Sequence, residues 1–283
     1  MIELVKGVGK VGRGKRMRVG SATQWCRTRV RSCRSHVLLR TELLAMGVDF
    51  DAAWCATDLG DHRPCRYTYE RYPYDTLPPL GRKQLTGVFQ WLGDPGEVVA
   101  ERAAKVRQLE ERLAAEGLTL PKDFVTFHVS SNLREALDSV SVTGCWSSLS
   151  DPLPSPVEPG AFVVRFFRDQ QDCVLWYLYL RPSGEVFVVN SYLDYEYEYE
   201  ARDSEDSEQE SELNDVAAQK AEILWCAPSF EHFAYRFWLE NRLWRAVNGV
   251  GDVFLDVEMQ EYLDHYEAAS PQERLGRRVA GQI

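Results

Sequence analysis

Residues 162–190 read FVVRFFRDQQDCVLWYLYLRPSGEVFVVN, and this stretch decides the fold. It contains three runs that are almost entirely β-branched or aromatic, which is typical of strands. The runs are Val163–Phe167, Val174–Leu180 and Val186–Val189. Between the last two, Arg181-Pro182-Ser183-Gly184 predicts a type I turn closed by a glycine bulge, because proline fixes φ early in the turn and glycine accepts a positive φ at its end. We therefore expect three consecutive strands, the last two forming an antiparallel hairpin.

Strands that are apolar on both faces need cover on at least one of them. The aromatic stretch 229–247 can provide that cover as a helix. Ser229 is a good N-cap, and Phe230, Phe233 and Phe237 fall near one face at helical spacing. The prediction is an α+β fold, with an antiparallel or at most mixed central sheet covered by helices.

Ahead of the sheet, the pattern predicts helices and one irregular segment. An apolar stripe predicts a helix over 95–116, which Gly117 ends with a Schellman cap. A second, short helix is expected to begin at Pro121. The segment 83–92 also has helical spacing, whereas 62–81 is rich in tyrosine and proline and is predicted to be an irregular wrap.

Composition and charge divide the chain into regions. Residues 1–40 carry eleven Lys or Arg against Glu3 alone, which leaves 22 basic and 42 acidic residues in the other 243, a net charge of −20. An acidic globular part repels nucleic acid and anionic lipid and attracts basic partners. We assign the regions as a basic disordered arm (1–40), an irregular and helical extension (41–97), an α+β domain (98–270) with an acidic loop insertion (194–220), and a C-terminal tail (271–283).

Two interpretations of the basic arm stay open. The arm can bind nucleic acid non-specifically through its phosphates. Alternatively, it is a dispensable extension, or upstream sequence translated from a misassigned start, since Met17 and Met46 offer later ones. No apolar run of about 18 residues and no secretory signal is found, so a cytoplasmic protein without a membrane span is expected.

Seven scattered cysteines do not suggest a disulfide framework, and Cys145, Cys173 and Cys226 lie in apolar runs, which predicts buried thiols. Two further groups raise the question of zinc. They are Cys26, Cys33 and His36, and Cys55, His62 and Cys65. Neither has the C-x2-C spacing typical of structural zinc, so no metal site is predicted. The catalytic and nucleotide-binding motifs that we considered are missing as well, so no enzyme activity and no cofactor are predicted.

The candidate partner-binding site lies in residues 192–215, YLDYEYEYEARDSEDSEQESELND. Tyrosine and glutamate alternate over 195–200, which predicts an edge strand with tyrosines on one face and carboxylates on the other, followed by a solvated acidic loop. We call the residues expected to contact a partner the acidic strip. They are Tyr195, Glu196, Tyr197, Glu198, Tyr199, Glu200, Asp203, Glu205, Asp206 and Glu208. The alternative is a solubilising insertion with no partner.

Several short motifs carry a family resemblance. They are the helix before Leu120-Pro121-Lys122-Asp123-Phe124, the strand pair 174–189, the segment Pro228-Ser229-Phe230-Glu231-His232-Phe233 with the aromatic helix after it, and the closing Glu261-Tyr262-Leu263-Asp264-His265-Tyr266. Over residues 98–267 the chain resembles the SUKH superfamily, a group of bacterial toxin-immunity proteins and fungal cell-wall-synthesis regulators.

The resemblance implies a non-enzymatic protein-binding module. The expected function is that of a bacterial immunity protein that neutralises a cognate basic protein, such as a nuclease toxin, by occluding its active site with an acidic surface. The alternative is a regulatory or scaffold protein that uses the basic arm on nucleic acid or the acidic strip on a cellular partner.

Overall fold

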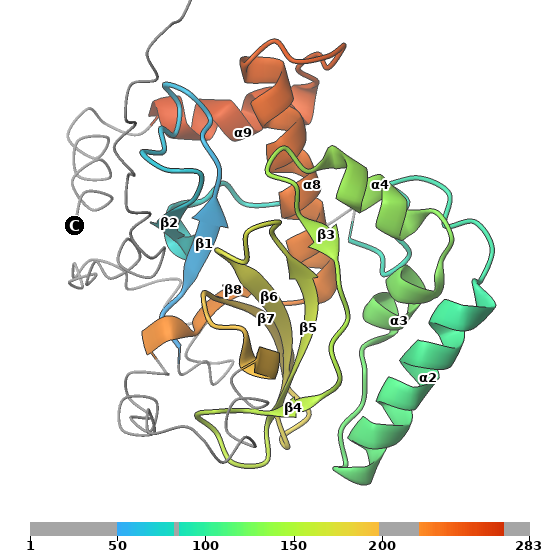
Figure 1. Ribbon diagram of the computed structural model, residues 1–283. Helices are drawn as coiled ribbons and strands as arrows, with labels where there is room; N and C mark the ends of the chain where they lie inside the picture. Colours follow the sequence, from blue (N-terminus) through green and yellow to red (C-terminus); the bar gives the residue numbers. More distant parts are fainter. Residues whose placement is uncertain (1–49, 82–84, 198–220, 269–283) are drawn as a thin grey trace, which may run out of the picture. The chain divides into compact units, whose positions relative to one another are not determined.

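A six-stranded antiparallel sheet in the order β3-β5-β6-β7-β8, with β4 also paired to β5, forms the centre of the protein. The computed structural model describes residues 50–81, 85–197 and 221–268 (Figure 1). The strands are β3 (Trp146–Ser147), β4 (Leu153–Pro154), β5 (Phe162–Arg168), β6 (Leu175–Leu180), β7 (Val186–Ser191) and β8 (Leu224–Ala227). The three strands predicted from residues 162–190 are therefore confirmed.

The turn between β6 and β7 has the geometry expected from its sequence. The Gly184 N–H donates to the Arg181 carbonyl over 2.9 Å, and the Arg181 N–H donates to the Glu185 carbonyl over 2.9 Å. Gly184 has a φ of +88°, which a side chain would strain. The register Leu180↔Val186 follows directly from this turn.

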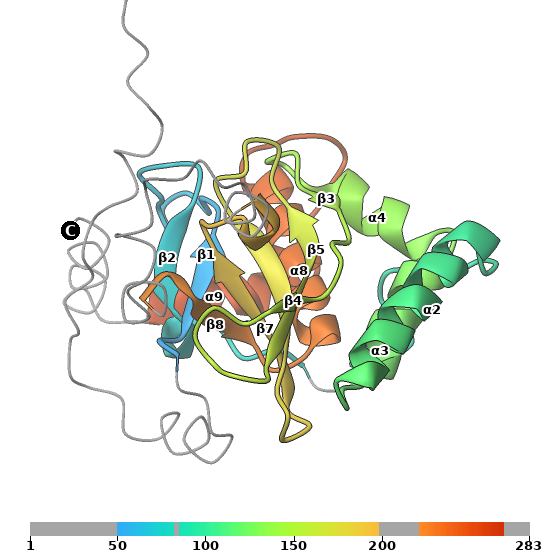
Figure 2. The same cartoon turned by 60° about the horizontal axis from the view of Figure 1, so that its bottom comes forward.

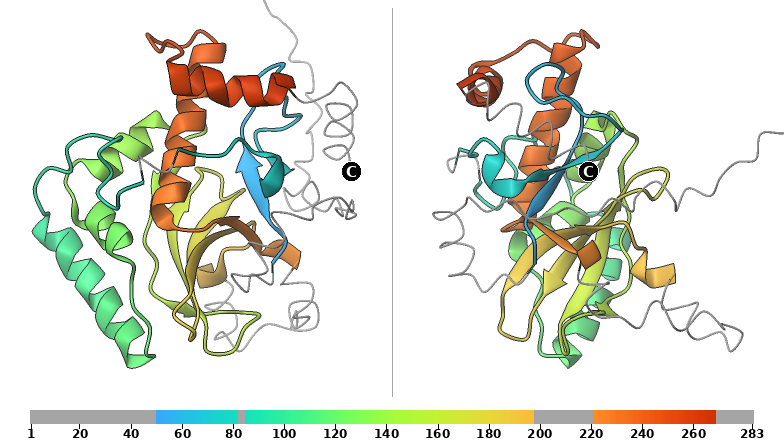
Figure 3. Two further views of the ribbon diagram at one scale, coloured as in Figure 1. Left: turned by 180° about the vertical axis from the view of Figure 1, so that it is seen from behind. Right: turned by 90° about the vertical axis from the view of Figure 1, so that its left-hand side faces the viewer.

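Both faces of the sheet are buried. Along β6, Trp176, Leu178 and Leu180 belong to one apolar cluster, and Leu175, Tyr177 and Tyr179 belong to another on the opposite face. The first cluster includes side chains of helix α8 (Phe230–Val247), which covers the face seen from behind in Figure 3. The period of two along the strand thus divides the core into two layers.

Helix α8 begins and ends as the sequence predicts. The Ser229 side chain accepts a hydrogen bond from the His232 N–H over 3.3 Å, which confirms the N-cap. At the other end Gly249 has a φ of +62°, and the Val250 N–H bonds to the Arg245 carbonyl over 2.9 Å. This is the geometry of a Schellman cap.

Three helices lie together beside the sheet, as Figures 1 and 2 show from two directions. They are α2 (Ala100–Ala115), α3 (Lys122–Val129) and α4 (Leu133–Val140). The first starts five residues later than predicted, but it ends at Gly117 as expected, with the Leu118 N–H bonded to the Leu113 carbonyl over 2.9 Å. The last helix, α9 (Val257–Ala268), lies across α8. None of the described helices is long and apolar enough to cross a membrane.

The irregular wrap predicted for 62–81 is wrong over part of its length. Strand β2 (Glu70–Pro73) pairs with β1 (Ala53–Ala56) and is followed by a 3-10 turn, η2 (Tyr74–Thr76). A parallel bridge joins Ala52 to Trp225 of β8, and the Trp225 N–H donates to the Asp51 carbonyl over 3.0 Å. Pro73 is the last residue of β2, and the other prolines of the segment, Pro64, Pro78 and Pro79, lie outside the strands, so none interrupts the ladder. The described part of the range assigned to an extension therefore packs into the domain core.

The short helix predicted over 83–92 is also wrong for its described part, residues 85–92. The Glu231 carboxylate of α8 accepts hydrogen bonds from the backbone N–H of Gly87 at 2.5 Å, that of Phe89 at 3.2 Å and the indole of Trp91 at 3.2 Å. Phe89 takes a φ of +55° and is completely buried. A tertiary carboxylate captures the N–H groups that a helix would need for itself.

Candidate functional site

The acidic strip begins within the described residues and continues beyond them. Tyr195, Glu196 and Tyr197 are described, and they are helical, so the predicted edge strand is wrong at these three positions. The other strip residues lie outside the described residues. They are Glu198, Tyr199, Glu200, Asp203, Glu205, Asp206 and Glu208.

The three described strip residues have different surroundings. Tyr195 is only 2% exposed, and its hydroxyl donates to the Ser191 hydroxyl over 3.0 Å. Glu196 accepts a hydrogen bond from the Arg165 guanidinium at 2.6 Å, and that guanidinium also pairs with Asp194 at 2.7 Å. Tyr197 is 68% exposed. Of the three, Tyr197 is the most exposed, and the Glu196 side chain is 38% exposed although it pairs with Arg165.

We expect alanine substitutions at the two tyrosines to separate these roles. Tyr195→Ala should lower the free energy of unfolding by about 3 kcal/mol, because it leaves a cavity in the second cluster. Tyr197→Ala should change it by less than about 0.5 kcal/mol. Urea denaturation measures both. Equal losses in the two variants would contradict this assignment of core and surface.

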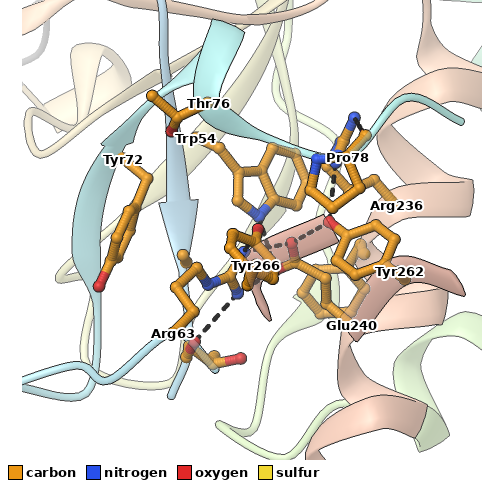
Figure 4. A network of polar contacts seen from close by, with 12 residues as sticks. Trp54, Arg63, Tyr72, Thr76, Pro78, Arg236, Glu240, Tyr262 and Tyr266 are labelled. Carbon is orange, nitrogen blue, oxygen red and sulfur yellow. Dashed lines mark hydrogen bonds and ion pairs between the residues drawn. The ribbon is translucent and has the colours of Figure 1, made fainter. Parts of the chain in front are cut away.

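A buried polar network joins β1, α8 and α9 (Figure 4). Its centre is the Glu240 carboxylate, which accepts four hydrogen bonds. One oxygen accepts from Trp54 at 2.8 Å and Arg63 at 2.7 Å. The other accepts from Arg63 at 2.6 Å and the Tyr262 hydroxyl at 2.5 Å. All four lone-pair positions of the carboxylate are therefore used.

A second buried guanidinium, that of Arg236, lies beside this carboxylate. It donates to the Tyr262 hydroxyl at 2.7 Å and to the Pro78 carbonyl at 3.0 Å. Burial raises the pKa of Glu240, but the charges of Arg63 and Arg236 and the Tyr262 hydroxyl lower it more, so the net pKa lies below the ordinary value. A saturated carboxylate with a lowered pKa is a poor base at neutral pH. The network therefore works as a clamp between elements rather than as a reaction centre.

A shallow hollow of about 320 Å³ adjoins the network and is lined by Asp61, His62, Tyr266 and Glu267. The His62 imidazole lies 3.4 Å from the Glu267 carboxylate.

Within the described ranges, no group of three His, Cys, Asp or Glu side chains is placed to hold a metal ion. Cys26, Cys33 and His36 lie outside these ranges. Cys145 and Cys226 are buried thiols, as predicted, and Cys55 is buried as well. Cys173 is exposed, contrary to prediction.

The two most exposed large apolar side chains of the described residues lie in the loop between α8 and α9 and at the first residue of α9. Phe254 is 82% exposed and Val257 is 77% exposed, and Leu255 and Val250 are exposed at 44% and 41%. Large apolar groups left in water next to one another are typical of interaction sites. We call residues 250–257 together with the solvent side of α9 the α9 surface.

The α9 surface is also acidic. Residues 246–268 contain six carboxylates and no Lys or Arg. The acids are Asp252, Asp256, Glu258, Glu261, Asp264 and Glu267. Most of these side chains are exposed, so their combined field reaches solvent.

The base of the loop is held in place. Asp256 accepts a hydrogen bond from the Met259 N–H at 2.9 Å, which caps α9, and its other oxygen lies 3.3 Å from the Arg242 guanidinium. On the buried side of α9, Met259 and Leu263 pack against α8. The loop that carries Phe254 is therefore held in place at its C-terminal end. The sequence signal for it was Val253-Phe254-Leu255 between Asp252 and Asp256, after two glycines.

A scan against protein-family models, a search of curated proteins and a search of solved structures each found no match to this chain. The resemblance to the SUKH superfamily therefore stays a prediction from sequence motifs. The functional argument rests on the geometry of the α9 surface.

Proposed function

We propose that the protein is a non-enzymatic binding module for a basic protein, and that it serves as an immunity protein against a cognate basic toxin such as a nuclease. The observation that carries the proposal is the α9 surface, where four exposed apolar side chains adjoin six carboxylates in a segment, residues 246–268, that contains no Lys or Arg. Such a surface combines anchors for affinity with charge for steering.

The apolar side chains are the expected anchors. Interface hot spots are large side chains that become fully desolvated at the centre of a contact, and aromatic residues are the most common among them. Phe254 has the greatest exposure of the large apolar residues and lies at the middle of the loop. A partner with an apolar pocket would bury most of this ring, and the surrounding carboxylates would form the polar rim.

The carboxylates define the charge of the partner. A field of six acids attracts a basic surface from beyond contact distance and repels an acidic one. A nuclease carries such a basic surface where it holds a phosphate backbone. Occupying that surface would block access of the nucleic acid, and this is the occlusion mechanism that the family resemblance implies. A function of this kind belongs in the bacterial cytoplasm.

A regulatory or scaffold role is the second candidate. It is favoured by the charge of residues 1–40, a net +10 on a chain of net −10. That arm would bind phosphates in a salt-dependent manner. A toxin gene adjacent to the gene for this chain would favour the immunity function, and its absence would favour the scaffold.

The test begins with capture of partners from the native host by the full chain. We expect a basic protein to be recovered, and its binding kinetics are then measured with the wild type and with four variants. Phe254→Ser should raise the dissociation rate about 30-fold, the equivalent of a hot spot of about 2 kcal/mol. The double variant Glu261→Lys/Asp264→Lys should lower the association rate about tenfold at low salt. Salt at 1 M should mimic it, because the Debye length falls to about 3 Å.

Glu110→Lys on the exposed side of α2 is the matched control and should leave both rates unchanged. The strip residues beyond Tyr197 are tested in the same assay by Glu198→Lys/Glu200→Lys. A partner whose rates are the same with all of these variants would overturn the proposal and place the interface elsewhere. Recovery of an acidic partner would overturn the charge argument.

A further inference from the structure

A second feature of the surface is a cluster of cations on an otherwise acidic domain. Arg102 and Lys105 lie three residues apart on α2, and Arg134 lies on the neighbouring helix α4. Figure 2 shows α2, α3 and α4 side by side, at a distance from α9. Residues three apart share one face of a helix, so the two α2 cations lie on the same side of it.

The partners of these three cations are chiefly backbone carbonyls. Arg102 donates to the carbonyl of Ser130 at 2.6 Å, Arg134 donates to that of Ser147 at 3.0 Å, and Lys105 donates to that of Leu149 at 2.9 Å. These bonds satisfy backbone carbonyls, but they do not neutralise the positive charges of the three side chains. The Arg134 Nε is buried and has no hydrogen-bond partner among the described residues.

Two carboxylates lie close enough to matter. Glu135 is 3.9 Å from the Arg102 guanidinium and has an 81% exposed side chain, so the pair is loose. Asp138 accepts hydrogen bonds from the N–H and hydroxyl of Ser147 instead, at 2.9 and 2.8 Å. Burial raises the pKa of Asp138, although those bonds and the nearby arginines oppose the shift. The charge of the cluster is therefore only partly compensated.

Beneath the cluster lies His128 of α3, which is 1% exposed. Neither of its ring nitrogens has a hydrogen-bond partner within residues 50–81, 85–197 and 221–268. Its ring packs against Phe124 at 4.3 Å and Phe230 at 5.6 Å between centroids. A neutral imidazole keeps one N–H donor. Burying that donor without a hydrogen-bond acceptor costs free energy.

The electrostatics connect the histidine to the cluster above it. Burial lowers the pKa of His128 well below its ordinary value, and the positive charges of Arg134, Arg102 and Lys105 lower it further. Arg134 likewise has a lowered pKa, from burial and from the charge of Arg102. Three positive charges thus lie near two buried donors that lack acceptors, the His128 ring and the Arg134 Nε. An anion in this position would neutralise the charges and accept hydrogen bonds from the donors.

We propose that Arg102, Lys105 and Arg134 form a binding site for a phosphate group, above the buried imidazole of His128. A phosphate matches the site because it brings several acceptor oxygens and up to two negative charges, and guanidinium groups bind it through paired N–H donors. The group can belong to free phosphate or to a small phosphomonoester. The site is separate from the α9 surface and does not depend on the proposed partner.

The test measures the melting temperature of the full chain in inorganic phosphate, with sodium chloride at equal ionic strength as reference. We expect a saturable rise of about 3 °C at tenfold excess over the dissociation constant. In the same titration the ring resonances of His128 should shift in nitrogen-15 NMR. Phosphoserine in place of phosphate shows whether a phosphomonoester is preferred.

Arg134→Gln and Lys105→Gln should abolish the rise, and Arg107→Gln, an exposed position on α2 with the same charge change, should keep it. Lys105 is exposed, so its variant keeps the test valid even if Arg134→Gln fails to fold. Equal melting temperatures in phosphate and chloride would overturn the proposal and leave ordered water as the partner of His128. So would an unchanged response in the Lys105→Gln and Arg134→Gln variants.

Discussion

Replacing Glu240 with glutamine should lower the free energy of unfolding at pH 7 by about 3 to 5 kcal/mol, the usual loss when one partner of a buried ion pair is removed. The amide has the shape of the carboxylate, but it cannot neutralise Arg63, and its NH₂ group would face donors where the carboxylate offered an acceptor. Two of the four hydrogen bonds at Glu240 come from Arg63 and one each from Trp54 and Tyr262. No other described element can supply the missing charge, since Arg236 is itself a cation.

Urea denaturation of the two proteins measures the loss. Glu261→Gln, an exposed position on α9, is the matched control and should stay within about 0.5 kcal/mol of the wild type. The double variant Arg63→Met/Glu240→Met should recover part of the loss, because it removes the uncompensated charge together with its partner. A Glu240→Gln protein as stable as the control would show that the network contributes packing alone.

The pH dependence follows from the lowered pKa of Glu240. A carboxylate with a lowered folded-state pKa stabilises the protein above its unfolded pKa of about 4.3, and that stabilisation is lost as the pH falls through the folded value. The difference in free energy of unfolding between the wild type and Glu240→Gln should therefore be at its maximum at pH 6 and should decrease below about pH 4. A gap that stays constant down to pH 3 would mean that Glu240 is not charged in the folded protein.

Phe230→Ala should cost about 3 to 5 kcal/mol of unfolding free energy, the range for large aromatic truncations in a core. The Phe230 ring meets four phenylalanine rings from a loop, a helix and a strand. These are Phe89 at 6.0 Å, Phe124 at 5.1 Å, Phe127 at 4.9 Å and Phe166 at 5.0 Å. Such a site cannot collapse around the cavity, because the four neighbours are held by three separate elements, with Phe124 and Phe127 both on α3.

The same substitution at an exposed phenylalanine is the control. Phe254→Ala removes an equal number of atoms from a ring that is 82% exposed, and it should change the stability by less than about 0.5 kcal/mol. Denaturant midpoints of both variants test the contrast. A Phe254→Ala protein that loses as much stability as Phe230→Ala would show that the α8–α9 loop is packed, and it would remove the basis for the α9 surface as a docking site.

The sheet could be predicted from sequence because its signals are local. The β6–β7 hairpin is specified within residues 174–190 by two continuous runs of aliphatic and aromatic residues and one turn, and the cap of α8 by a single serine. These are interactions between neighbours in the chain, so a pattern is enough to reveal them.

The prediction for residues 62–92 failed because the interactions of this segment are made with residues distant in sequence. Residues 85–92 have helical spacing, but Glu231, about 140 residues later, takes their N–H groups. Strand β1 depends on Trp225 in the same way. A sequence pattern contains no information about which carboxylate or strand will approach from another region.

The surroundings of the candidate site residues could not be predicted for a related reason. Tyr195 and Tyr197 look equivalent in an alternating pattern, yet one enters the core and the other stays in water. Conversely, Phe254 and Val257 look like core residues between two helices, and only the fold shows that α9 buries its other face. Composition could reveal an acidic chain, but not where its exposed apolar groups would lie.

The clamp at Glu240 has a consequence for the order of events during synthesis. Arg63 lies 177 positions before Glu240 and 203 before Tyr266. At a synthesis rate of about 5 to 20 residues per second, the ribosome needs roughly 10 to 35 s to make the 177 residues that separate Arg63 from its counter-charge. Until then β1 and β2 have neither α8 nor α9 to cover them. Arg63 therefore meets its counter-charge only late in synthesis, by closure of a very long loop.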